Sequence, residues 1–254
     1  VRLAPGERRR VVFGLGYGKD DDEIHEICAK YRDSDRTMQE FSSMEAYWEE
    51  LLGRVQVQTS DKSINIMLNG WLLYQNISCR MYARAAFYQC GGAYGFRDQL
   101  QDGMALMYAQ PELLRDQILM ASSRQFEEGD VQHWWHPPTG IGVRTWISDD
   151  LLWLPYITAF YITATGDYSI LEEERPFIQG PVLGDDQHDM MFVPDISETS
   201  VSLYEHCKKA IKHVRLGEHG LPLIGGGDWN DGINEIGIKG QGESVWLAWF
   251  LYAV

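Results

Sequence analysis

The stretch SDDLLWLPYITAFYITA, residues 148 to 164, indicates a buried helix, because most side chains after its first three residues are apolar. Ser148 is a candidate N-cap, and Asp149 and Asp150 suit the first turn, where a carboxylate interacts favourably with the helix dipole. Helical periodicity also occurs in segments 61–88, 98–109, 111–126, 167–178, 198–215 and 243–254. The sequence therefore predicts a mainly α-helical fold from about residue 60 onward, with glycine- and proline-rich loops between the helices.

The first 59 residues have a different pattern. RRRVVFGLGY, residues 8 to 17, predicts a strand, and segments 19–33 and 36–54 predict two helices. We interpret this part as an edge strand and a helical linker rather than a complete domain. At the other end, the apolar run VWLAWFLYAV has no evident packing partner, so we expect the chain to be a fragment of a longer protein.

The composition excludes several classes of function. The 254 residues carry a formal net charge of −15, which disfavours binding to nucleic acid or to an anionic membrane surface. The sequence contains no apolar run of membrane-spanning length and no signal-peptide pattern. Four cysteines lie scattered without a CxxC pair, which is typical of reduced thiols in a cytoplasmic protein, although one disulfide is also compatible with them. Nine tryptophans among many polar residues suit a sugar-binding site.

The segment GGGDWNDGIN, residues 225 to 234, allows three interpretations. Its glycines and Asn-Asp-Gly sequence are typical of a tight turn. Its carboxylates and amides could bind calcium, but the glycine spacing differs from that of an EF-hand loop. In the third interpretation, Asp231 beside Trp229 is a catalytic acid next to a ring on which a sugar stacks.

Two other segments carry clustered polar chemistry. YGFRDQLQD, residues 94 to 102, can be a helix start with an internal Arg–Asp pair, or an arginine held beside carboxylates in a pocket. HWWHPPTGIGVRTWISDD, residues 133 to 150, contains an HxxH pair that hints at metal, but it lacks HExxH and a partner cysteine. Dinucleotide, P-loop and serine-hydrolase motifs are absent from the sequence.

Taken in order, FYQCGGAYGFRDQLQD, DVQHWWHPPTGIGVRTWISDDLLWLPY, SVSLYEHCKKAI and GLPLIGGGDWNDGIN resemble glycoside hydrolase family 94 over nearly the whole chain. That family contains inverting cellobiose, chitobiose and β-1,2-oligoglucan phosphorylases and the C-terminal domain of cyclic β-1,2-glucan synthases. The motifs are most similar to the β-1,2-glucan branch. The resemblance implies an (α/α)6 barrel. Residues 1–59 would be the end of a β-sandwich and a linker, and residues 60–254 the N-terminal half of the barrel.

The resemblance also implies roles for single residues. Asp231 matches the family's general acid, and Trp229 lines the same pocket. Arg97 and Asp102 match positions that bind the donor-subsite sugar and lie near phosphate. A second loop that contacts the sugar matches Arg144, Asp149 and Asp150. Trp146 stands where we expect arginine in close relatives, which bears on the substrate.

The implied reaction is phosphorolysis of a β-glucosidic bond. Asp231 would protonate the bridging oxygen, and phosphate would attack the opposite face of the sugar to give α-glucose 1-phosphate. Because phosphate is already an anion, no second carboxylate is needed as a base, and no metal or cofactor is expected. The expected partners are an oligosaccharide and inorganic phosphate, and a homodimer is a further expectation for the full-length protein. The family's later phosphate-binding histidine and its Thr-Gly pair lie past Val254, so we expect this segment alone to be inactive.

Two alternatives remain open from the sequence. An inverting hydrolase on the same barrel would use water and a base such as Asp102. A non-catalytic module that controls chain length within a larger cyclic glucan synthase would bind carbohydrate without cleaving it.

Overall fold

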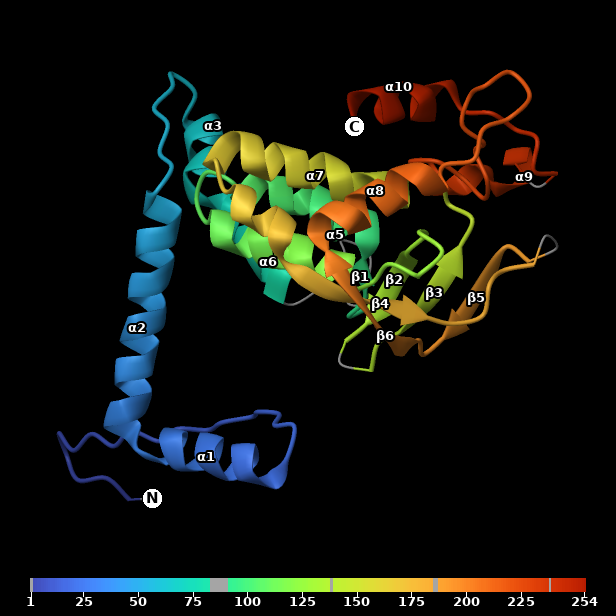
Figure 1. The fold of residues 1–254 in the computed structure, drawn as a ribbon. Helices are drawn as coiled ribbons and strands as arrows, with labels where there is room; N and C mark the ends of the chain where they lie inside the picture. Colours follow the sequence, from blue (N-terminus) through green and yellow to red (C-terminus); the bar gives the residue numbers. More distant parts are fainter. Residues whose placement is uncertain (1, 83–90, 138, 185–186, 238) are drawn as a thin grey trace. The chain divides into compact units, whose positions relative to one another are not determined.

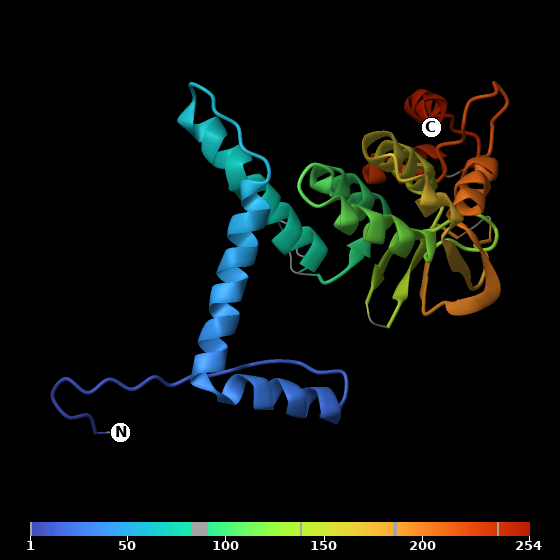
Figure 2. The same cartoon turned by 60° about the vertical axis from the view of Figure 1, so that its left-hand side comes forward.

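The structure is a computed structural model that describes residues 2–82, 91–137, 139–184, 187–237 and 239–254. Its contacts divide the chain into two units, Val1–Arg54 and Val55–Val254, whereas the sequence analysis places the boundary between residues 59 and 60. The two units are drawn in Figure 1 and, after a rotation, in Figure 2. Within the described residues, no helix combines the length and apolar character that crossing a membrane requires.

The first unit contains two helices, as predicted. They are α1 (Asp21–Arg32) and α2 (Ser34–Gly53), and the side chains of Asp20 and Asp33 accept hydrogen bonds from the first-turn amides. The strand expected over residues 8–17 is wrong, since these residues have no strand pairing. A strand requires a hydrogen-bonded neighbour, and the described part of this unit contains no second strand.

The second unit begins with a helical segment that is interrupted. It runs through α3 (Lys62–Ile66), η1 (Met67–Trp71), α4 (Leu72–Gln75) and η2 (Asn76–Tyr82). The backbone kinks at Gly70, where φ is 157°. The side chain of Asn69 accepts from the Val57 amide at 2.7 Å and donates to its carbonyl at 2.8 Å. The last part of the predicted helix, residues 83–88, lies outside the described residues.

The main hydrophobic core lies among five helices. They are α5 (Phe96–Gly103), α6 (Pro111–Ser122), α7 (Asp150–Thr165), α8 (Leu203–His213) and α10 (Val245–Ala253). A short 3-10 helix, η3 (Met104–Leu106), follows α5. Helix α7 packs against α5, α6 and α8 (Figure 1). Its apolar residues, including Leu152 and Ile157, join the core. The prediction of a mainly helical second unit is therefore confirmed.

The sequence analysis missed the β-structure. Strands β1 (Tyr94–Gly95), β2 (Gln132–His136), β3 (Ile141–Thr145) and β5 (Asp189–Phe192) form an antiparallel sheet in that order. Strands β4 (Glu174–Gln179) and β6 (Asp195–Ser202) form a separate antiparallel pair. The helices expected over 167–178 and 198–215 are therefore wrong in part. Only the 3-10 helix η4 (Tyr168–Glu172) and α8 are helical there.

The segment GGGDWNDGIN is attached to the connection between β3 and α7. Ile147 forms β-bridges with Gly225 and Gly227, and the Gly226 amide donates to the Trp146 carbonyl at 2.8 Å. Gly225 has φ +61°, and a Cβ atom there would lie 2.0 Å from the Trp146 carbonyl oxygen. Only glycine therefore permits this approach. The segment continues into η5 (Asp231–Ile233) and α9 (Asn234–Gly237).

This attachment also changes the start of α7. The N-cap is Asp149 rather than Ser148, so the expected role of Ser148 is wrong. The Ser148 hydroxyl and amide instead donate to the Gly227 carbonyl at 3.0 and 2.9 Å. Ser148 therefore stabilises the contact between two distant segments instead of the helix end. Of the cysteines, Cys28, Cys79 and Cys207 are free thiols, and Cys90 lies outside the described residues.

Candidate active site

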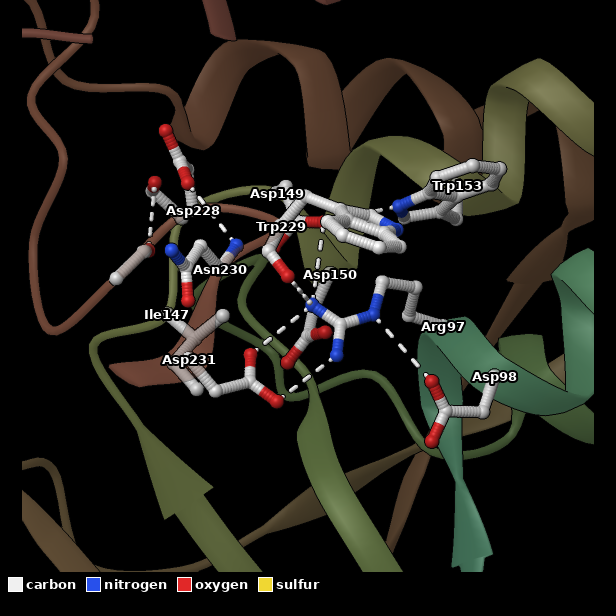
Figure 3. A network of polar contacts seen from close by, with 12 residues as sticks. Arg97, Asp98, Ile147, Asp149, Asp150, Trp153, Asp228, Trp229, Asn230 and Asp231 are labelled. Atoms are coloured by element: carbon white, nitrogen blue, oxygen red, sulfur yellow. Dashed lines mark hydrogen bonds and ion pairs between the residues drawn. The ribbon is translucent and has the colours of Figure 1, made fainter. Parts of the chain in front are cut away.

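Arg97 and Asp231 form a bidentate ion pair between segments 134 residues apart. Arg97 lies at the start of α5 and is 7% exposed, whereas the Asp231 side chain is 47% exposed. The two guanidinium nitrogens donate to the two carboxylate oxygens at 3.0 and 2.9 Å, as Figure 3 shows. Arg97 Nη1 also donates to the Trp229 carbonyl at 3.2 Å. The two parallel hydrogen bonds hold Asp231, and with it the later part of the GGGDWNDGIN segment, beside the start of α5.

Two buried carboxyl groups at the start of α7 complete the surroundings of Arg97. Asp149 Oδ2 lies 3.5 Å from Arg97 Nη1 and accepts from Trp153 Nε1 at 3.0 Å. Burial raises the pKa of Asp149 to about 7, with a further rise from the charge of Asp150 and an opposing effect of Arg97. Asp150 lies 2.7 Å from Nδ1 of His133. One oxygen of each carboxyl group, Oδ1, is buried without a hydrogen-bond partner in the described residues.

Asp102 is linked to this cluster only through other residues. Its carboxylate forms an ion pair with Arg80, whose Nη2 lies 3.8 Å from Asp98. Asp98 in turn lies 3.4 Å from Arg97 Nε. Burial raises the pKa of Asp102, although the neighbouring Arg80 opposes that rise. Alternating charges thus run from Asp102 along one side of α5 to Arg97.

Trp229 and Asp228 have different surroundings within the same turn. The Trp229 side chain is 52% exposed, and the Arg97 guanidinium lies 6.0 Å from its ring centroid. Asp228 is buried, accepts from the Ser244 hydroxyl at 2.7 Å and from the Asn230 amide at 3.1 Å. The accessible indole can therefore contact a ligand, while Asp228 holds the turn together.

Arg144 lies apart from these residues, on strand β3. It is 2% exposed, and its guanidinium forms ion pairs with Asp130 at 2.6 Å and Glu128 at 2.9 Å. Its remaining nitrogen donates to the Pro181 carbonyl at 3.0 Å, and the group stacks on Phe126 at 3.9 Å. Every nitrogen of the guanidinium is thus engaged within the protein, and none of its hydrogen-bond partners belongs to the group around Arg97 and Asp231.

The family described as "Glycosyl hydrolase 94 superfamily, catalytic domain" matches residues 47–254. The chain belongs to the glycosyl hydrolase 94 superfamily. Both segments that form the Arg97–Asp231 pair lie inside the matched range.

Several relatives share this superfamily's sequence pattern. The cyclic beta-(1,2)-glucan synthase NdvB of Rhizobium meliloti (strain 1021) is 47% identical over 99% of this chain and 9% of that protein. The solabiose phosphorylase of Paenibacillus borealis is 29% identical over 98% of the chain and 29% of that protein. The N,N'-diacetylchitobiose phosphorylase of Vibrio proteolyticus is 28% identical over 95% of the chain and 31% of that protein. The chain thus spans less than a third of the length of each of these relatives.

The sequence analysis missed three residues of this candidate site. Trp153 lies one helical turn after Asp149, and this i,i+4 spacing was a usable signal. Arg80 lies on a different helical segment, 22 residues before Asp102, and no local pattern indicates the pair. His133 was considered only as a metal ligand. Among the described residues, no group of three or more His, Cys, Asp or Glu side chains could hold a metal ion.

We expect Arg144→Met to destabilise the protein without changing the Arg97 site. Removing one partner of a buried ion pair leaves the other charge uncompensated, which costs about 3–5 kcal/mol. Glu128 is partly exposed, so we expect the lower end of that range. Urea denaturation measures the free energy of unfolding. An unchanged unfolding midpoint, together with a weakened affinity for substrate, would instead place Arg144 in substrate binding.

We expect Asp149→Asn to change the pH dependence of stability. The pKa of Asp149 is raised from 3.8 to about 7, so the folded protein retains a proton that the unfolded chain loses within this range. The free energy of unfolding should therefore fall as pH rises from about 4 to about 7. Asparagine cannot titrate, so this contribution should vanish in the variant. Urea denaturation at several pH values measures the free energy of unfolding. If this free energy changed with pH in the same way in the wild type and in Asp149→Asn, the prediction of a buried, protonated carboxyl group would be contradicted.

Proposed function

We propose that the protein carrying this chain catalyses inverting phosphorolysis of a β-glucosidic bond in an oligoglucan. The observation that carries the proposal is the Arg97–Asp231 pair. It places a carboxyl group that matches the family's acid directly beside an accessible tryptophan and an arginine. The superfamily membership and the phosphorylase relatives support this choice of reaction.

The Arg97–Asp231 ion pair bears on the order in which phosphate binds and Asp231 is protonated in the proposed reaction. In the structure, both oxygens of Asp231 accept hydrogen bonds from Arg97. Phosphate is an oxyanion that matches the same guanidinium fork. We propose that phosphate takes the place of the Asp231 carboxylate on Arg97. Asp231 then turns toward the glycosidic oxygen and takes up from solvent the proton that it donates.

The bonds that break and form, and the protons that move, balance without a catalytic base. Asp231 gives its proton to the bridging oxygen as the glycosidic bond breaks, and a phosphate oxygen forms a bond to the anomeric carbon from the opposite face. The products are α-glucose 1-phosphate and an oligosaccharide that is one residue shorter. The proton that the phosphate group subsequently loses balances the one that Asp231 regains. A hydrolase would need a second carboxylate to activate water.

The linkage and the remaining roles are also part of the proposal. The 47% identity to a cyclic beta-(1,2)-glucan synthase favours a β-1,2 linkage. Trp229 would stack on the sugar. Asp149, Asp150 and Asp102 would position it or orient the arginines that do so. We leave Arg144 out of the sugar contacts because its guanidinium is fully engaged elsewhere. The helices of the second unit would form half of an (α/α)6 barrel.

The test is an assay of the full-length protein with β-1,2-linked glucooligosaccharides, with and without inorganic phosphate. We expect glucose 1-phosphate to form only with phosphate, and proton NMR should show the α anomer. Release of free glucose at the same rate without phosphate would favour hydrolysis. Binding of the oligosaccharide without any cleavage would favour a non-catalytic module.

A further inference from the structure

His133 lies at an irregularity in strand β2. The pairing with β3 shifts between Gln132, which faces Arg144, and Trp134, which faces Val143, so His133 is an extra residue opposite no partner. Such a β-bulge redirects a side chain and is common beside active sites. Here the histidine lines a small pocket that Arg97 and Asp231 also line.

Asp150 fixes the orientation and favours the charge of this histidine. The buried carboxylate of Asp150 lies 2.7 Å from Nδ1, so this nitrogen donates and Nε2 is left for another partner. Burial is the largest single effect and lowers the pKa of His133, but the charge and the hydrogen bond of Asp150, together with the charge of Asp231, outweigh it and the pKa is raised. The charge of Arg97 opposes this rise. A protonated ring can donate a hydrogen bond from Nε2.

The pocket that His133 and Arg97 line is small. Its volume is about 50 Å³, which exceeds the ~10–15 Å³ that one water molecule requires. Its charged lining consists of Arg97, His133, Asp98, Asp150 and Asp231. Arg97 is engaged by Asp231, whereas no hydrogen bond from His133 Nε2 occurs to any described residue. This histidine is therefore the donor available to an incoming anion.

We propose that His133 binds the oxyanion co-substrate, with Nε2–H donating to one phosphate oxygen while Arg97 binds the others. The inference rests on the proposed function, which supplies phosphate as the nucleophile. The pocket also contains three carboxylates, which would oppose anion binding. His133 is paired with Asp150, and Asp231 leaves Arg97, so the phosphate meets two cations.

The test is titration calorimetry of the full-length protein with inorganic phosphate and inorganic sulfate. We expect His133→Gln to weaken the binding of both anions at least about tenfold, as for loss of a hydrogen bond to a charged group. The matched control is His136→Gln. His136 lies on the same strand and packs against Trp134 at 5.4 Å without lining the pocket, and its replacement should leave anion affinity unchanged.

The pH dependence of sulfate binding gives a second readout. Sulfate does not titrate near neutral pH, and its affinity for the wild type should fall as pH rises through the raised pKa of His133. Asp149 also titrates in this range. The decisive quantity is therefore the part of the fall in sulfate affinity that is seen in the wild type and is absent from His133→Gln. Asp150→Asn should shift that fall to lower pH, because the histidine loses its carboxylate partner. This variant also serves if His133→Gln does not fold, and an unshifted fall would overturn the proposal.

Other outcomes are equally decisive. Equal sulfate affinity in the wild type and His133→Gln, or no anion binding to the wild type, would overturn the proposal. So would a raised KM for the oligosaccharide with an unchanged KM for phosphate, because the histidine would then contact sugar. Absence of phosphate-dependent cleavage by the wild type would refute the proposed function alone, since the sulfate titrations would still decide the role of His133.

Discussion

Asp231→Asn should lower phosphorolysis by about 10²–10⁴-fold, the range typical of a lost general acid. Asparagine is nearly isosteric with aspartate, so the turn and Trp229 should stay in place and oligosaccharide binding should persist. The amide has no acidic proton to transfer, and the leaving sugar would depart as a poorly stabilised alkoxide. The measurements are the rate of glucose 1-phosphate release and the dissociation constant of the oligosaccharide.

The matched control for this variant is Asp228→Asn. Asp228 accepts hydrogen bonds from Ser244 and Asn230 and stabilises the same turn, so its replacement should cost less activity and more stability. If Asp231→Asn kept more than a tenth of the wild-type rate while Asp228→Asn was inactive, the acid would be Asp228.

Arg97→Ala should lower kcat/KM for phosphate by roughly 10²–10³-fold, as when a preorganised donor to a developing charge is removed. The variant loses both nitrogens of the fork that holds Asp231, and it loses the cation nearest to Asp149. Arg97→Lys should recover only part of the activity, because an ammonium group cannot bind an oxyanion in a bidentate manner. Initial rates at varied phosphate concentration measure both effects.

A comparison with Arg144→Met separates the site from general stability. Both arginines are buried and paired with carboxylates, but Arg144 pairs with Asp130 and Glu128 away from the pocket. We expect the Arg144 variant to unfold more easily while its KM for phosphate stays unchanged. If the two variants lost phosphate affinity to the same extent, Arg97 would have no specific role.

The sequence predicts the helices of this fold better than its strands, for a physical reason. Helix α7 shows its apolar character and its acidic first turn within one short segment. Strand β5, in contrast, pairs with β3 across a long connection, and nothing local in DMMF indicates that partner. The hairpin of β2 and β3 was not predicted because the sequence HPPTG between its strands has the composition of a loop.

The same distinction applies to the site. Arg97, Asp149 and Asp231 stand in motifs whose polar chemistry is visible in the sequence, and the structure brings them together. Arg144 stands in an equally suggestive motif, but its partners Asp130 and Glu128 come from the preceding loop. His133 depends on a shift in strand pairing, which no short pattern records.

The contact between the acid-bearing segment and residue 146 has an evolutionary consequence. Gly226 binds the backbone carbonyl of Trp146, while the indole of Trp146 stacks against Arg215 at 4.4 Å. The position of Asp231 therefore depends on main-chain atoms at this point and is independent of the side chain. Position 146 can thus accept different residues while Asp231 keeps its place, whereas Gly225 is constrained by the close approach of its backbone to that carbonyl. Selection can therefore change the side chain at position 146 without moving Asp231.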